Sequence, residues 1–322
     1  MSEAAWWRHL RGDPTRFLLG DDEPGVVWRA LTTLLGRPPD SPAVVRARLA
    51  ARETGTAAGL LAQQNPFGYW GSPVAYGARW GGTAWHVIAL AALGADPEDP
   101  RAGRAAEKLL ESLQPRAGGF SAARGRPPSP CFTAEVCAAL ARFGFAHNPR
   151  VREAVAWLAE RNGGVGGWSC PELRHLVTGA CPIVCVAALR FLAELTPEER
   201  APLAGMAKRA AGALMDAGLW LEGNAPRGWW AFAHPNLGRT DLLDALFVLA
   251  RNGAPAEPPV LRALLGVLAR QDGSGRWSQQ QAVPFGEPAG EPSRWVTLKA
   301  LVSVAAYGEA LAVHRGGDAC GA

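Results

Sequence analysis

Residues Gln271–Trp277 read QDGSGRW, and similar stretches occur at four other places in the chain. Each has a glutamine or asparagine, three residues of any kind, a glycine, one further residue and an aromatic residue. Glycine loses more backbone freedom on folding than any other residue, so its pairing with a large ring indicates a tight turn that the ring anchors. The copies start roughly 50 residues apart, which indicates a structural repeat. The other four are Gln64–Trp70, Gln114–Phe120, Asn162–Trp168 and Asn224–Trp230.

A second repeat lies between these turns. Six segments that are apolar nearly all round share an alanine-leucine pair, and this composition is typical of buried helices. The small alanine at the same place in every copy suits a close approach of two helices, so we predict six inner helices. The shared alanines are Ala30, Ala89, Ala139, Ala188, Ala245 and Ala300.

More amphipathic segments alternate with the apolar ones. Asp99–Leu113, Asn148–Glu160 and Pro258–Arg270 place arginine and glutamate on one face and apolar residues on the other. Their Asp-Pro, Asn-Pro and Pro-Pro starts are signals for helix N-termini. These segments therefore predict outer helices that cover the inner ones.

The alternation predicts an all-α protein, an (α/α)6 toroid made of one domain over residues 1–322. The repeats cover about residues 24–310, an N-terminal helix over Glu3–Leu10 closes the ring as the sixth outer helix, and residues 311–322 form a flexible tail. An open helical solenoid is the alternative. The apolar inner set and the helices at both ends favour closure.

Composition narrows the class of protein. The chain has 322 residues, is 48% hydrophobic and carries a net charge of +4, as expected of a globular protein. It has no long basic run that would indicate nucleic-acid binding. We see no signal-peptide pattern at the N-terminus and no apolar run that approaches a membrane span of about 20 residues. With six scattered cysteines, the sequence predicts a cytoplasmic protein with reduced thiols.

The repeated turn resembles the QW motif of triterpene cyclases, and it is also similar to the repeats of protein prenyltransferase β subunits. Together these form the prenyltransferase/squalene-oxidase repeat group, and the resemblance covers about residues 24–310. It implies an α/α toroid whose central cavity holds an isoprenoid or another apolar ligand. It matches one toroid domain, without the second domain of full-length triterpene cyclases.

Three motifs of related enzymes are missing from this sequence. The chain has no D-x-D-D motif, with which class II terpenoid cyclases protonate an alkene, and no Asp-x-Cys pair, with which protein prenyltransferases hold zinc. It also lacks the DDxxD cluster of class I terpene synthases. An acid, if there is one, must therefore come from another part of the chain.

The starts of the inner helices are where we expect the catalytic groups. Glu135 and Asp241 both stand four residues before the shared alanine, and His86 stands one position later in its own helix. A desolvated carboxyl has a raised pKa and can donate a proton, so Asp241 is the expected acid, assisted by Asp244, Glu135 or His86. The alternatives are that the acids cap their helices and that His86 is a hydrogen-bonded core residue.

Aromatic residues near the same helix starts are candidates for binding the substrate, because ring faces stabilise a carbocation. They could equally pack the wall of the toroid. Arg239 lies close to Asp241 in the sequence, and the basic loop Arg116–Pro130 could cover the cavity, meet an anionic headgroup or lie in solvent. The aromatic candidates are Trp80, Trp85, Trp229, Trp230, Phe232 and Trp295.

A zinc site is a further candidate. Cys170, His175 and Cys181 form a loose cluster of residue types that zinc accepts, although unligated residues would give the same pattern. Apart from that zinc, we expect no cofactor.

The sequence therefore favours a terpenoid cyclase-like enzyme that starts a cyclisation or isomerisation of a small apolar or isoprenoid substrate by protonation. The alternatives are a non-catalytic toroid that binds a lipid or protein partner, and a zinc-dependent enzyme. A glycosidase on the same toroid is possible, but it would need more paired carboxylates.

Overall fold

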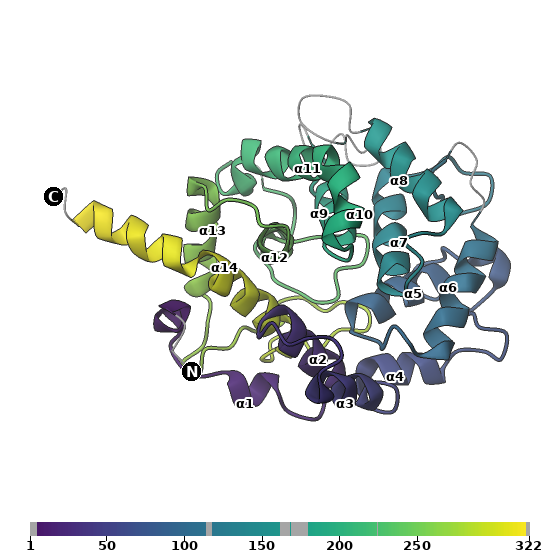
Figure 1. Ribbon diagram of the computed structural model, residues 1–322, viewed down its shortest axis with the longest axis horizontal. Coiled ribbons are helices and arrows are strands. Elements are labelled where there is room, and N and C mark those ends of the chain that lie inside the picture. The colour runs from purple at the N-terminus through teal and green to yellow at the C-terminus, as the bar shows by residue number, and fades with distance from the viewer. Residues whose placement is uncertain (1–4, 114–117, 162–167, 169–179, 224, 320–322) are drawn as a thin grey trace.

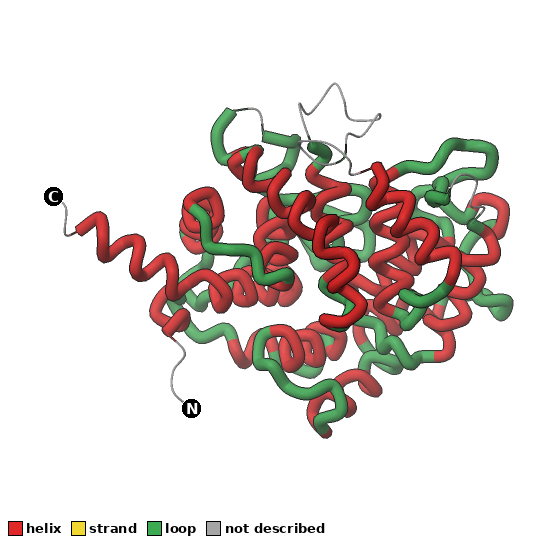
Figure 2. The backbone as a smooth tube through the Cα atoms, turned by 45° about the horizontal axis from the view of Figure 1, so that its top comes forward, coloured by secondary structure: helices red, strands yellow, loops and turns green. Residues whose placement is uncertain are grey.

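The computed structural model describes residues 5–113, 118–161, 168, 180–223 and 225–319 (Figure 1). Within these ranges the chain forms helices and loops, with an isolated bridge between Ser278 and Pro292 (Figure 2). The prediction of an all-α protein is confirmed.

The six predicted inner helices are all present, and each contains its shared alanine. Three of them begin with a proline and one with a threonine. A proline at the start costs no hydrogen bond, because the first amides of a helix have no partner within it. The inner helices are α2 (Pro24–Thr33), α5 (Thr83–Ala92), α7 (Pro130–Arg142), α9 (Pro182–Leu192), α12 (Leu242–Arg251) and α14 (Arg294–Ala319).

Outer elements lie between successive inner helices and pack on them. The predicted outer segments correspond to α6 (Pro100–Ser112), α8 (Pro149–Arg161) and α13 (Pro258–Leu268). The side chain of Asp99 caps α6 by accepting a hydrogen bond from the Arg101 amide. The remaining outer elements are α3 (Pro42–Ala50), α4 (Gly55–Ala62), α10 (Pro197–Arg200), η3 (Ala201–Leu203), α11 (Ala204–Asp216) and η4 (Gly218–Trp220), with a short η2 (Pro73–Ala75) in the loop before α5.

The ring is closed between the two ends of the chain. Helices α5, α7, α9, α12 and α14 pack in that order, and α14 packs on α2. The N-terminal segment forms a 3-10 helix, η1 (Ala5–His9), followed by α1 (Thr15–Leu18), and both contact α14. In Figure 1 the purple N-terminal elements accordingly lie beside the yellow helix α14.

The tryptophans of the repeated turn form the same hydrogen bond in four repeats. Each indole Nε1 donates to the carbonyl ten residues earlier, at or near the end of the preceding outer element. Because the turn's backbone also bonds to the start of the next inner helix, the motif fastens consecutive units together, as the sequence indicated. The pairs are Trp70 with Leu60, Trp168 with Leu158, Trp229 with Leu219, and Trp277 with Val267, at 2.7–3.1 Å.

The fourth repeat corrects our alignment. We aligned Trp230 with the other motif aromatics, but Trp229 makes the shared bond, to Leu219 at 2.7 Å. Trp229 is only 1% exposed, whereas Trp230 is half-buried under Arg270, which follows α13. Trp229 keeps the ten-residue spacing to its acceptor, but the glycine stands directly before the ring in this repeat, and the sequence pattern did not allow for that.

The glutamines of the motif bond from one unit to the next. Gln64, after α4, donates to the Arg101 carbonyl at the start of α6 at 3.0 Å. Gln271, after α13, donates to the His9 carbonyl at 3.0 Å and accepts from the Arg11 amide at 2.8 Å. The N-terminal segment therefore occupies the place of an outer element in the sixth unit.

Helix α14 differs from two of our expectations. The predicted tail after residue 310 is helical as far as Ala319 and projects from the body of the protein (Figure 1). By length and composition, residues 294–313 could also cross a membrane. Our expectation that no apolar segment approaches the length of a membrane span was therefore wrong. However, 67% of that stretch is buried in the protein, as in a core helix of a soluble protein.

Candidate functional site

A cavity of about 70 Å³ lies where the six inner helices meet, and residues from all six line it. This is small beside the roughly 300–1,000 Å³ of typical ligand pockets. The described conformation therefore has room for a small group, and a whole isoprenoid chain would require side chains to move.

One column of the repeat faces this cavity. The residue immediately before the shared alanine lines the cavity in five of the six helices. Three of these residues are charged, which is unusual in helices that are otherwise apolar. The five are Arg29, Ile88, Ala138, Asp244 and Lys299.

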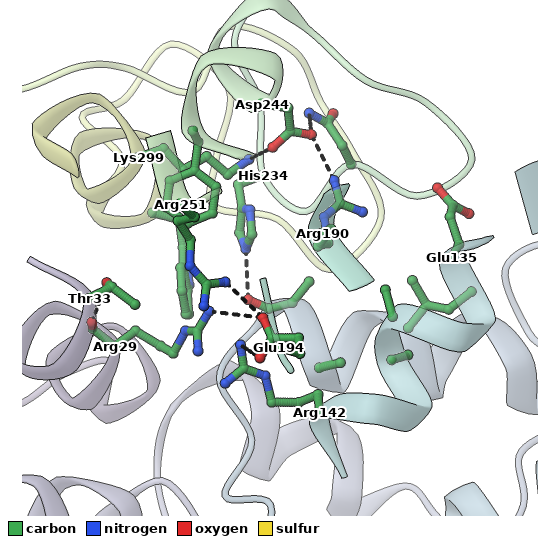
Figure 3. Close-up of a pocket in the computed structure, with 18 of the residues that line it drawn as sticks. Arg29, Thr33, Glu135, Arg142, Arg190, Glu194, His234, Asp244, Arg251 and Lys299 are labelled. Atoms are coloured by element: carbon green, nitrogen blue, oxygen red, sulfur yellow. Dashed lines mark hydrogen bonds and ion pairs between the residues drawn. The ribbon is translucent and has the colours of Figure 1, made fainter. Parts of the chain in front are cut away.

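Asp244 forms the centre of one end of the cavity (Figure 3). Its carboxylate lies 2.5 Å from Lys299 Nζ and accepts from Asn236 Nδ2 at 2.8 Å. Arg190 Nη2 lies 3.2 Å away. Burial alone would raise the pKa of Asp244, but Lys299 and Arg190 bring that pKa below its ordinary value, so Asp244 is a fixed negative charge.

His234 and Trp295 also line this end, with their rings stacked 4.7 Å apart. His234 Nε2 bonds to the Ala92 carbonyl at 3.0 Å. Burial and the charge of Lys299 hold the pKa of His234 well below its ordinary value, so the ring is neutral. Within the described part of the chain, His234 Nδ1 and Trp295 Nε1 are buried without a hydrogen-bond partner, and a ligand or water in the cavity would satisfy them.

Glu135, in the first half of α7, lines the cavity beside Asp244 and Arg190. Its two carboxyl oxygens lie 2.9 and 3.1 Å from the Gly238 amide, which donates to them. Gly238 has φ +62, and a Cβ there would lie 3.1 Å from Arg79 and 3.2 Å from Trp85, so this close approach requires glycine. Burial raises the pKa of Glu135 to about 7.

Asp241 is desolvated, as we expected, and it is also the helix cap that we gave as the alternative. Its side chain caps α12 by accepting from the Asp244 amide at 2.8 Å. It also accepts from the Ala233 amide and from Asn236 Nδ2. Burial raises the pKa of Asp241 to about 6, yet all these bonds suit its ionised form, and among the described residues it is Asp244 that lines the cavity.

The opposite end of the cavity holds a group of three arginines around one carboxylate (Figure 3). Glu194, which follows α9, lies 2.5 Å from Arg142 and 2.8 Å from Arg251. Arg29 Nη2 lies 3.6 Å from the same carboxylate. We call Arg29, Arg142, Arg251 and Glu194 the arginine cluster.

The other predicted acid or base, His86, packs in the wall of the ring. Its ring stacks on Trp70 at 4.7 Å and lies 5.1 Å from Phe285. Nδ1 lies 3.1 Å from the Gly82 carbonyl, and burial lowers the pKa of His86.

The predicted aromatic residues are divided between several places. Trp295 lines the cavity, whereas Trp80 and Trp85 pack edge to face at 5.0 Å beneath Arg79. Trp229 and Trp230 belong to the repeated turn, as described above. Phe232 is fully buried and lies under Arg270, and Arg239 bonds to Gln281.

The predicted zinc ligands are only partly described. Cys170 and His175 lie outside the described residues, so that site stays a prediction. Cys181 lies at the start of α9, with its Sγ 3.7 Å from Cys131 Sγ. In the described ranges, no group of three or more His, Cys, Asp or Glu side chains is placed to hold a metal ion.

The basic loop Arg116–Pro130 is described from residue 118. Arg124 and Arg126 are exposed, and the loop is held by a bond from Tyr76 Oη to the Ser121 carbonyl at 2.9 Å. Residues 123–127 of this loop therefore lie in solvent, which is one of our three expectations, whereas residues 118–121 are buried.

The sequence analysis did not identify most of the charged residues that line the cavity. Arg29, Asp244 and Lys299 share the position before the alanine, so the column one turn further along the helices carried the signal. Arg142 and Arg251 had no such signal, because a basic residue in the last turn of a helix is common.

Comparison with known proteins gives a distant structural likeness. The sequence matches no protein-family model and no curated protein. The solved structure of type II terpene cyclase MstE from Scytonema shares 16% identity, covers 90% of this chain and 88% of its own, and has a TM-score of 0.45. A variant of MstE in complex with its substrate, geranylgeranyl dihydroxybenzoate, shares 15% identity over 78% of this chain and 94% of its own, with a TM-score of 0.32.

Proposed function

We propose that the protein is an enzyme that protonates an unsaturated isoprenoid, or a similarly apolar substrate, in its central cavity and thereby starts a cyclisation or isomerisation. Glu135 carries this proposal. It is a buried carboxyl that lines the cavity, and burial raises its pKa to about 7, so at neutral pH much of it holds a proton. A general acid works best when its pKa lies near the working pH. The resemblance of the repeats to those of triterpene cyclases agrees with this chemistry.

We assign the acid to Glu135 rather than to Asp241. Asp241 accepts three hydrogen bonds and caps α12, so protonating it would cost the helix its cap. Glu135 accepts from one backbone amide, Gly238, and keeps lone pairs for a proton.

In the proposed step the carboxyl proton of Glu135 passes to one carbon of a double bond. The π electrons form the new C–H bond, and the neighbouring carbon becomes a carbocation. The ring of Trp295 lines this end of the cavity, where its face would stabilise positive charge. Loss of a proton from a neighbouring carbon then gives a neutral product and restores the acid.

Deuterium incorporation tests this proposal. Geranylgeraniol or squalene, incubated with the protein in D₂O, is expected to give a product with deuterium at the protonated carbon. We expect Glu135→Gln to lower the rate about 100-fold or more, because general acid catalysis contributes about 10²–10⁴-fold. Glu111→Gln, at an exposed ion pair on α6, is the matched control. Full activity in Glu135→Gln would contradict the assignment.

A non-catalytic binding protein is the second candidate function, and the small cavity favours it. A cavity of about 70 Å³ takes a small polar group more readily than a folded polyene. Native mass spectrometry separates the two candidates. A bound molecule whose mass is the same before and after incubation supports a binding protein, whereas a bound molecule that is converted to a product supports an enzyme.

A further inference from the structure

The charges that line the cavity do not balance. Five lining side chains are basic and three are acidic, and His234 is held neutral. With Glu135 protonated, the lining therefore carries an excess of three positive charges. Buried charges usually have partners, because an unpaired charge in a low-dielectric interior is costly.

The excess is concentrated in the arginine cluster. Three guanidinium groups surround Glu194, so this end of the cavity carries two uncompensated positive charges. Glu194 accepts about four hydrogen bonds at most, whereas the three guanidinium groups bring many more N–H donors. Arg29 in particular stands 3.6 Å from the carboxylate, too far for a good hydrogen bond.

The arginines are held in place although they repel one another. The guanidinium groups of Arg29 and Arg142 both lie over the ring of Trp28, at 5.1 and 5.5 Å. Trp28 is itself fixed by a bond from Nε1 to the Gly94 carbonyl at 2.7 Å. Burial and the neighbouring arginines lower the pKa of Arg29 well below its ordinary value, a cost that an anion would remove.

The cluster is also reachable from solvent. The side chains of Arg29, Arg142 and Arg251 keep 11%, 10% and 15% of their surface exposed. A preorganised set of arginines binds phosphate oxygens in bidentate fashion. We propose that the arginine cluster is a binding site for a phosphate or diphosphate group, in which Arg29, Arg142 and Arg251 hold the anion. Binding of this anion needs no proton transfer, so the site stands whether or not the protein is a cyclase.

Two sources of that group fit the chemistry: a free anion, and the headgroup of a larger molecule whose remainder extends toward Glu135. Arg142 stands seven positions after Glu135 in α7, which is about 10 Å along a helix. An anionic headgroup at the cluster would therefore place a carbon chain at the other end of the cavity.

Thermal unfolding with three probes tests the site: inorganic phosphate, inorganic diphosphate and farnesyl diphosphate. A ligand that binds only the folded state raises Tm with its concentration. A rise with inorganic diphosphate or phosphate supports a free anion, and a rise with farnesyl diphosphate alone supports a headgroup. No rise with any of the three would overturn the site.

The variant Arg29→Gln distinguishes a binding site from a structural ion cluster. Glu194 keeps Arg142 and Arg251 in this variant, so we expect Tm without anion to stay the same or to rise as repulsion is relieved. Anion affinity is expected to fall about tenfold or more. Arg262→Gln, at an exposed pair with Glu222, controls for the loss of one positive charge. An unchanged affinity in Arg29→Gln, or a lower Tm without anion together with an unchanged Tm shift on adding it, would contradict the proposal.

Discussion

Glu135 and Asp244 show how one cavity keeps two carboxyl groups in different charge states. Asp244 lies against Lys299 and Arg190 and stays ionised. Glu135 is equally buried but receives one backbone amide, and burial outweighs the charges of Arg190 and Arg79 and raises its pKa to about 7. The partners of each carboxyl, rather than its depth, decide its charge.

This difference predicts how stability depends on pH. Below the ordinary pKa of 4.5, Glu135 is protonated in both the folded and the unfolded state. Between 4.5 and about 7 only the unfolded state releases the proton, so the free energy of unfolding falls as pH rises, by a few kcal/mol at most.

The variant Glu135→Gln cannot ionise and lacks this loss. We therefore expect its Tm, relative to that of the unaltered protein, to be higher at pH 7.5 than at pH 5, as calorimetry would show. A Tm difference that stays the same at the two pH values would mean that Glu135 is not held protonated in the folded protein.

The sequence identified these acids as candidates but did not show which of them line the cavity, for a physical reason. The inner helices are apolar nearly all round, so hydrophobic periodicity identified them as buried without showing which face meets the cavity. We took the residues four before the alanine, which include Asp241, a helix cap. The cavity column starts one turn later, and Glu194 lies beyond its helix, where no periodic pattern reaches.

The repeated turn was predictable from the sequence, but which tryptophan makes the shared hydrogen bond in the fourth repeat was not. Gly228 and Trp230 satisfy the pattern, whereas Trp229 directly follows the glycine and does not. Only the bond from Trp229 to Leu219 shows which indole fastens the unit. The pattern requires one residue between the glycine and the ring, so it selected the wrong one of two neighbouring tryptophans.

A matched pair of variants tests this correction. Trp229→Phe leaves the Leu219 carbonyl without its donor in a buried place, so the free energy of unfolding is expected to fall by about 1–3 kcal/mol. Trp230→Phe keeps the ring at the half-buried surface of α13 and is expected to cost less than about 0.5 kcal/mol. Denaturant unfolding measures the free energy of unfolding of both variants. Equal losses would contradict the assignment of the shared hydrogen bond to Trp229 alone.

At the scale of the whole molecule, closure depends on a few polar contacts between distant parts of the chain. Gln271 bonds to His9 and Arg11, and His9 Nε2 bonds to the Gly308 carbonyl at 2.9 Å. The alternating helices predicted a toroid, and the similarity of these bonds to those of Gln64 explains why it closes. Within the described residues, the N-terminal helix that we expected over Glu3–Leu10 is a 3-10 helix over Ala5–His9.

Gln271→Leu is expected to loosen this closure. The substitution removes the acceptor of the Arg11 amide, so hydrogen exchange at Arg11 should become faster while exchange in α7 stays slow. Gln64→Leu removes the equivalent bond elsewhere in the ring and should leave exchange at Arg11 unchanged. Slow exchange at Arg11 in Gln271→Leu would show that η1 is held by its packing on α14 alone.

The bond of Gln271 to the N-terminal segment has a consequence for chain connectivity. Gln271 joins the last unit to the N-terminal segment much as Gln64 joins two neighbouring units, so the contact at the ring closure resembles a contact within the ring. A circular permutant could therefore begin in the exposed loop near Gly125, with the original N- and C-termini joined by a linker after Gly308. This permutant would form the same contacts in a different order along the chain. The contacts then specify the ring, and they do not specify where the chain is opened.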